Sequence, residues 1–256
     1  MKRLLLIILL ASFCVKFARA QQNPDSTSVK PDGKHLIKLN LTALPLNTYS
    51  GVYERAISKK TAAGVGFRYM PKGELPFLDN IKEAIDDPEV STHLSNLKLG
   101  NYAITPEVKF YLGKSVFRGF YIAPFGRYAV YTADLPFEFT VEQGGIERTE
   151  TIPLSGNITT ITGGLMFGAQ WKLSRRLYLD WFILGPNVGT AKGDITGNKT
   201  LSNEERDALQ DAIDDLIESD IPFVEIEGKA TNNGARIDFS GPWAGLRAGI
   251  SLGIRF

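Results

Sequence analysis

The sequence has little of several features that would point to a familiar chemistry or location. One of its 256 residues is a cysteine, Cys14, and two are histidines. Because Cys14 lies in the apolar N-terminal stretch, we expect neither disulfides nor thiol chemistry in the rest of the chain. After residue 20 no apolar run approaches the roughly 20 residues that a transmembrane helix needs, which excludes a helical membrane protein. The formal net charge of +1 argues against nucleic-acid binding.

The N-terminus has the three parts of an export signal. Residues 1–3 are basic apart from the initiator, residues 4–15 are apolar, and Ala18-Arg19-Ala20 forms a small-residue cleavage site. We therefore predict a signal peptide at residues 1–20, a polar periplasmic leader at 21–35 and a single folded domain at 36–256. Removal of the signal takes away four of the 29 basic residues and leaves a net charge of about −3.

Nearly every apolar stretch of the folded domain alternates with period two, which is typical of a β-strand with two different faces. One face carries large apolar and aromatic residues, and the other carries glycine and charge. A solvated face does not need glycine, whereas a narrow filled lumen does. The pattern therefore predicts an all-β fold, a single eight-stranded antiparallel up-and-down transmembrane β-barrel with its apolar face toward lipid. The eight stretches are 37–43, 49–56, 65–69, 102–110, 120–131, 165–171, 177–183 and 243–256.

The connections between these stretches alternate in length. The first, at 45–48, is short; from the second onward, short connections at 57–60, 113–119 and 174–176 alternate with long ones at 71–98, 132–157 and 188–239. Outer-membrane barrels have short periplasmic turns and long extracellular loops, so we expect all three long loops at one rim. These loops contain 23 acidic and 9 basic residues and should form an acidic cell surface, with short helices at 77–85 and 202–218.

Seven charged residues fall on the face predicted to point into the lumen. Buried charges are tolerated only when they are paired, so we expect a structural charge network, with Glu107 and Arg127 as the preferred pair. An ion or proton pathway is the alternative interpretation. An eight-stranded barrel is just wide enough for side chains to fill, which predicts a lumen closed to solutes. The seven are Glu54, Arg68, Glu107, Lys109, Arg127, Asp180 and Arg247.

These features resemble the small outer-membrane barrels of Gram-negative bacteria, the class that includes the OmpA transmembrane domain and OmpX. The final strand, which ends in Phe256, is similar to the signal read by the barrel-assembly machinery. The stretches 39–41, 53–55 and 64–69 also resemble the Bacteroidetes-type barrels of domain-of-unknown-function family 3575. The resemblance implies a location in the outer membrane of the cell envelope, in contact with its lipid and lipopolysaccharide. It implies no catalytic residue.

Two motifs suggest specific chemistry. In residues 194–205, Asp194, Thr196, Asn198, Ser202 and Glu205 match ligand positions of an EF-hand calcium loop, but Lys199 stands where the turn needs glycine. The alternative is a capping box, Ser202-x-x-Glu205, that starts an amphipathic helix.

The second motif is His93, which lies near serines and carboxylates and is a candidate general base. With only two histidines and one cysteine in the chain, the sequence nevertheless favours a non-enzymatic barrel. We expect its acidic surface loops to have structural or contact roles with an unidentified surface partner, and we assign no catalytic, cofactor or metal residue. The alternatives are a lipid hydrolase or acyltransferase using His93, and a narrow channel.

Overall fold

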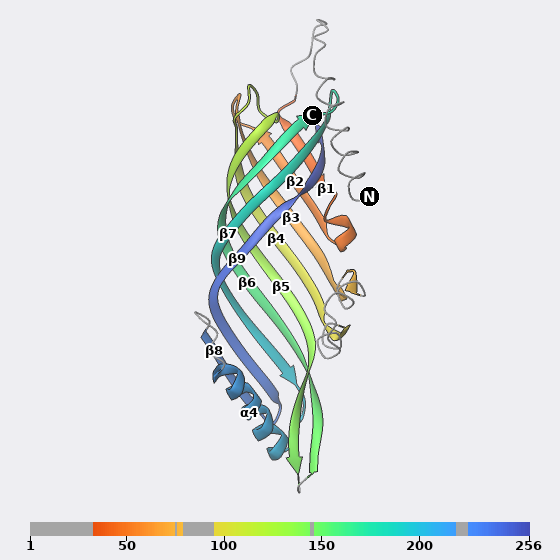
Figure 1. Cartoon of the computed structure of the whole chain (residues 1–256), viewed down its shortest axis with the longest axis vertical. Coiled ribbons are helices and arrows are strands. Elements are labelled where there is room, and N and C mark those ends of the chain that lie inside the picture. The colour runs from red at the N-terminus through yellow and green to blue at the C-terminus, as the bar shows by residue number, and fades with distance from the viewer. Residues whose placement is uncertain (1–32, 75, 79–94, 144–145, 219–224) are drawn as a thin grey trace, which may run out of the picture. The chain divides into compact units, whose positions relative to one another are not determined.

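A computed structural model of the chain describes residues 33–74, 76–78, 95–143, 146–218 and 225–256 (Figure 1). The predicted signal peptide, most of the leader, His93 and most of the predicted helix at 77–85 lie outside these residues. Within them, no helix is long and apolar enough to cross a membrane. The strands are β1 (His35–Asn40), β2 (Tyr49–Ala56), β3 (Thr61–Glu74), β4 (Lys98–Tyr111), β5 (Gly119–Gln143), β6 (Ile146–Lys172), β7 (Leu177–Asn198), β8 (Glu225–Thr231) and β9 (Gly234–Arg255).

Eight of these strands close into a ring. Each strand from β1 to β7 pairs antiparallel with the next, β7 pairs with β9, and β9 returns to β1. The backbone N–H of His35 donates to the carbonyl of Phe256 at 3.0 Å, so the first and last strands of the barrel start and end at the same rim. The predicted eight-stranded antiparallel barrel is confirmed. The strand β8 lies outside the ring and pairs only with the first part of β9.

The outer face of the ring is apolar, as the alternation predicted. Phe67 is 54% exposed, and its neighbours Gly66 and Arg68 belong to the inward face. Tyr49, Tyr69 and Tyr102 stand opposite one another on β2, β3 and β4, and they form an exposed outer belt with Tyr128 of β5. Aromatic girdles of this kind mark the membrane–water interface. From Tyr102 to Phe110, β4 has about the 9–11 residues that a transmembrane strand needs.

Four strands continue far beyond this tyrosine belt, which corrects the prediction of long loops at 132–157 and 188–239. The pairing of β5 with β6 runs without interruption to Gln143 and Ile146. Likewise β7 pairs with β9 as far as Asn198 and Gly234. The prediction was wrong here because it sought apolar residues on the outer face, and that rule ends where the membrane ends.

Beyond the belt the two faces exchange character. On the inward face, Phe139, Val141 and Ile152 are buried, whereas Glu138 and Thr140 point outward and are exposed. Inside the bilayer the apolar side chains face lipid. Beyond it they face each other, because burial away from water is favourable for apolar surface.

The helix α4 (Asn203–Glu218) covers this second core with Leu209 and Ile213. It confirms the helix predicted at 202–218. The predicted capping box is also confirmed: Glu205 Oε2 accepts from the backbone N–H of Ser202 at 2.8 Å, and Ser202 Oγ accepts from that of Glu205 at 3.2 Å.

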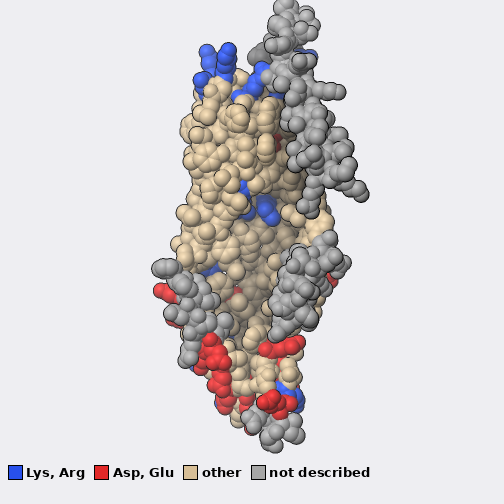
Figure 2. Space-filling model, in the orientation of Figure 1, with Lys and Arg blue, Asp and Glu red and all other residues tan. Residues whose placement is uncertain are grey.

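The two rims differ in their connections and in their charge. The turns at 57–60, 112–118 and 173–176 lie at the rim of the chain termini, and the β1–β2, β3–β4, β5–β6 and β7–β9 connections lie at the other rim. The three connections predicted to be long therefore share one rim, as predicted. Figure 2 shows Lys and Arg gathered at the turn rim, Asp and Glu gathered at the opposite end, and an almost uncharged wall between them. In outer-membrane barrels the short turns are periplasmic, so the acidic end is extracellular.

Candidate functional site

A compact ion cluster crosses the lumen, built from residues two or three positions from the periplasmic ends of their strands. It consists of Lys38 from β1, Glu54 from β2, Lys109 from β4 and Asp180 from β7. Lys109 Nζ lies 2.7 Å from Asp180 Oδ2 and 2.8 Å from Glu54 Oε1, and Lys38 Nζ forms ion pairs with the same two oxygens. None of the four side chains is more than 3% exposed. Two cations and two anions thus neutralise one another inside the barrel.

Aromatic side chains fill the lumen on the periplasmic side of this ion cluster. The Tyr121 hydroxyl donates to Asp180 Oδ1 at 2.8 Å, and Lys109 Nζ lies 4.0 Å from the centre of the Tyr121 ring. Closer to the periplasmic rim, Phe117 and Tyr178 pack edge to face, and Arg255 Nη1 donates to the Tyr178 hydroxyl at 2.9 Å. The lumen is therefore packed at this end, as predicted for a barrel of eight strands.

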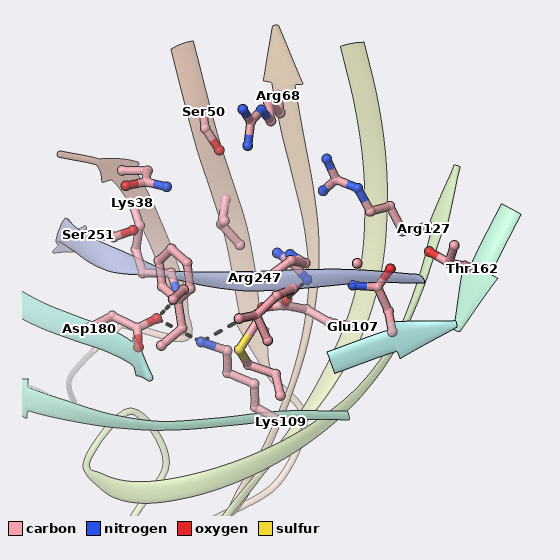
Figure 3. A pocket seen from close by; sticks show the side chains of 18 of the residues that line it. Lys38, Ser50, Arg68, Glu107, Lys109, Arg127, Thr162, Asp180, Arg247 and Ser251 are labelled. Carbon is pink, nitrogen blue, oxygen red and sulfur yellow. Dashed lines mark hydrogen bonds and ion pairs between the residues drawn. The ribbon is translucent and has the colours of Figure 1, made fainter. Parts of the chain in front are cut away.

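A cavity of about 160 Å³ lies on the extracellular side of the ion cluster. Three guanidinium groups project into it, from Arg68 on β3, Arg127 on β5 and Arg247 on β9 (Figure 3). Arg247 Nη1 lies 3.8 Å from Glu107 Oε2, which is beyond hydrogen-bond range. Arg127 donates to Thr105 Oγ1 at 3.3 Å. Unlike the ion cluster, this cavity has more positive than negative side chains.

The structure places all seven predicted lumen residues on the inner face, but it pairs one of them differently. The prediction that Glu107 pairs with Arg127 is wrong. Among the described residues, Glu107 forms ion pairs with Lys109, at 3.7 Å, and with Arg247. The register explains the difference, because β4 and β5 set Phe125 opposite Glu107.

The prediction also omitted Lys38. Its position on the polar face of an alternating strand was a sufficient signal.

The EF-hand interpretation of residues 194–205 is also corrected. Asp194, Thr196 and Asn198 belong to β7 and keep its extended ladder, so they cannot converge on an ion as a loop does. Lys199 Nζ donates to Glu150 Oε2 at 2.6 Å, and this hydrogen bond holds the pKa of Glu150 below its usual value. Within the described residues, no group of three or more His, Cys, Asp and Glu is placed to hold a metal.

The closed ring, the apolar outer wall and the tyrosine belt define an integral β-barrel protein of the bacterial outer membrane. Within that class the chain belongs to DUF3575, a family described as "protein of unknown function", which matches residues 5–185. No curated protein matches the chain.

Three solved bacterial structures are similar to this chain at low identity and low TM-score. The N-terminal β-barrel domain of Pseudomonas aeruginosa OprF is 6% identical, with a TM-score of 0.25 over 88% of this chain and 99% of that one. Acinetobacter baumannii CarO2 is 13% identical, with a TM-score of 0.35 over 85% and 100% of the two chains. The translocator domain of autotransporter NalP from Neisseria meningitidis is 10% identical, with a TM-score of 0.33 over 97% and 96%.

Proposed function

We propose that this outer-membrane barrel is not an enzyme and acts by contact, through the structured region that it carries beyond the membrane. This region, the extracellular extension, comprises the ends of β5, β6, β7 and β9 beyond the tyrosine belt together with α4 and β8. The observation that carries the proposal is its separate hydrophobic core, in which Phe139, Ile152, Leu209 and Ile213 are almost fully buried. Barrel closure needs none of these residues, so the core serves to hold a surface in shape.

The surface that this core supports is acidic. On α4 the side chains of Asp207, Asp211, Asp214 and Asp215 are exposed, and Figure 2 shows acidic groups concentrated at this end. A fixed negative surface favours partners with a basic patch, because complementary charge speeds encounter and rejects acidic competitors. The partner class that fits is therefore a cationic protein surface outside the cell.

The two alternative functions have less support. A hydrolase or acyltransferase would depend on His93, which lies outside the described residues. The other histidine, His35, lies at the rim of the chain termini, with Nδ1 2.6 Å from the Tyr53 hydroxyl. A channel would need a continuous path, whereas the ion cluster and the aromatic packing around Phe117 fill the lumen at its periplasmic end.

The test compares two variants in a strain that lacks the gene, with resistance to detergent and antibiotics as the readout. Because Asn198 stands opposite Gly234, residues 199–233 can be replaced by a two-residue Asn-Gly turn that preserves the β7–β9 hairpin. The matched variant is His93→Ala in the full-length chain. Heat-dependent mobility on gels shows whether each barrel has folded.

We expect the shortened barrel to fold and fail to rescue the strain, and His93→Ala to rescue it fully. Rescue by the shortened barrel together with failure of His93→Ala would refute the contact role and establish the enzyme.

A further inference from the structure

Among the residues that the structure describes, the barrel wall is incomplete on the extracellular side of β1. One edge of β9 pairs with β7 from Gly234 to Ile254, with one register shift opposite Ala248. The other edge pairs with β8 only up to Ser240 and with β1 only from Ser251, where Leu41 N–H adds a bond to the Ile250 carbonyl at 2.8 Å. Between these points, from Gly241 to Gly249, this edge has no strand partner among the described residues. In Figure 1 the far strands β3 and β4 are visible through this part of the wall.

The gap exists because the β1–β2 hairpin is short. β1 ends at Asn40, the chain turns through η1 (Leu44–Leu46), and β2 begins at Tyr49. The neighbouring strand β3 continues to Glu74, so its last residues pair with β4 alone. In the described part of the chain a lateral opening therefore lies between β9 and β3, and the β1–β2 hairpin borders it on the periplasmic side.

The cavity lined by Arg68, Arg127 and Arg247, called the arginine cavity below, reaches the lipid-facing surface through this opening. Leu246 and Ala248 point outward from β9, and Leu246 is 66% exposed. Both line the cavity together with the inward Arg247, so the cavity reaches the open edge of β9 at these residues. Figure 2 shows the same face hollowed at mid-height, with atoms of Lys or Arg visible in an otherwise uncharged wall.

The lumen around this cavity has an excess of two positive charges. Lys38, Lys109 and the three arginines face only Glu54, Glu107 and Asp180. The positive charge of Arg127 repels the positive charges of both Arg68 and Arg247. Holding three like charges around one cavity is unfavourable unless an anion joins them.

Three buried donors in the cavity wall have no hydrogen-bond partner in the described part of the chain. They are Arg68 Nε, Arg247 Nη1 and Thr162 Oγ1. Guanidinium groups are well suited to phosphate, since their planar forks bind its oxygens in pairs.

The depth of the arginines matches the headgroup region of the bilayer. Arg68 precedes Tyr69, and Arg127 precedes Tyr128, both members of the outer tyrosine belt. A girdle of this kind marks the level of lipid headgroups. The cavity thus lies at the depth where the phosphate of an outer-leaflet lipid would stand.

We infer that the lumen is a binding site for the phosphomonoester headgroup of a membrane amphiphile, which enters sideways between β9 and β3 while its chains stay in the bilayer. Arg68, Arg127 and Arg247 bind the phosphate. This site is separate from the extracellular extension and does not rest on the contact function proposed above.

The test measures lipid retention by native mass spectrometry on the full-length protein in detergent, with phosphatidic acid and phosphatidylcholine as probes. One variant, Arg68→Gln with Arg247→Gln, removes two of the guanidinium groups. Its control, Arg236→Gln, removes an exposed arginine of the extension. If the double variant fails to fold, Arg68→Gln alone takes its place.

A second pair of variants tests the lateral path. Ala248→Trp places a large side chain at the open edge of β9, and Val188→Trp places one on the outer face of β7, away from the cavity lining. Titration calorimetry with inorganic phosphate distinguishes a free anion from a lipid headgroup as the occupant.

We expect phosphatidic acid to bind at least about tenfold more tightly than phosphatidylcholine. The double arginine variant should lose about tenfold or more, the loss typical of a charge-assisted hydrogen bond, and Ala248→Trp should also weaken phosphatidic acid binding. Arg236→Gln and Val188→Trp should match the unaltered protein. Equal binding of the two lipids, or binding unaffected by loss of the arginines, overturns the site. Binding of inorganic phosphate that needs the arginines, without binding of phosphatidic acid, overturns the lipid as its occupant.

Discussion

Replacement of Asp180 by Asn tests whether the ion cluster holds the barrel together. The substitution keeps the size of the side chain and an oxygen that can accept from Tyr121, but it removes one negative charge. Lys38 and Lys109 then share Glu54 alone at short range, because Glu107 lies 3.7 Å from Lys109. All these groups are buried, so water cannot take over the lost charge.

The expected cost follows from that burial. Breaking a buried ion pair by removal of one partner costs about 3–5 kcal/mol, most of it from the charge left uncompensated. Asp238→Asn is the matched control, because Asp238 pairs with Arg236 in an exposed bridge and such bridges contribute little to stability. The double variant Lys38→Met with Asp180→Asn removes one charge of each sign and leaves the Lys109–Glu54 pair intact, so it should be more stable than Asp180→Asn alone.

The assay is urea unfolding of the protein folded into lipid vesicles, followed by tryptophan fluorescence and by gel mobility. We expect the free energy of unfolding to fall by about 3–5 kcal/mol in Asp180→Asn and to recover in part in the double variant. Equal stability of Asp180→Asn and Asp238→Asn would refute the reasoning. So would a Lys38→Met change that adds its own cost to that of Asp180→Asn.

Four further predictions concern the wall, the extension and the lumen. Val65→Arg, on the lipid face midway along β3, should destabilise the barrel by about 2–4 kcal/mol, whereas Thr140→Arg, outward but beyond the belt, should have no effect; equal costs in urea unfolding would contradict the assigned boundary. Ile213→Ala should destabilise the extension by about 2–5 kcal/mol and make it sensitive to limited proteolysis while the barrel stays intact, and unchanged cleavage would count against a separate core. The hydrogen bond from Lys199 lowers the pKa of Glu150 below its usual 4.5. The stability that this hydrogen bond gives the extension is therefore present above pH 4.5 and is lost as the pH falls through the lower pKa of the folded state. Hydrogen exchange in the extension should rise in that pH range for the unaltered protein, and Glu150→Gln should abolish this rise. Purified protein should give no stable conductance in planar bilayers, and reproducible single-channel steps would establish the channel.

The sequence by itself determined the membrane-spanning part of this fold. In a bilayer every strand must show apolar residues to lipid and small or polar residues to the lumen, so the alternation around Phe67 and Arg68 fixes the phase without further information. The alternation of short and long connections assigned the rims, and Ser202 with Glu205 marked the start of α4. These signals are local, and local spacing is enough to read them.

Only the tertiary structure decided how far the strands run and which charges meet. The stretch around Phe139 alternates as regularly as the membrane strands, but its apolar face points inward because water has replaced lipid outside. Glu107 meets Arg247 of β9 because strand register and closure of the ring bring the two together, and neither appears in the order of residues along the chain. Lys109, by contrast, is two residues from Glu107 on the same face of β4, and local spacing predicts that contact. The lateral opening beside Arg247 has the same origin: β1 is short and β9 is long, and the unpaired edge exists only once the ring has closed.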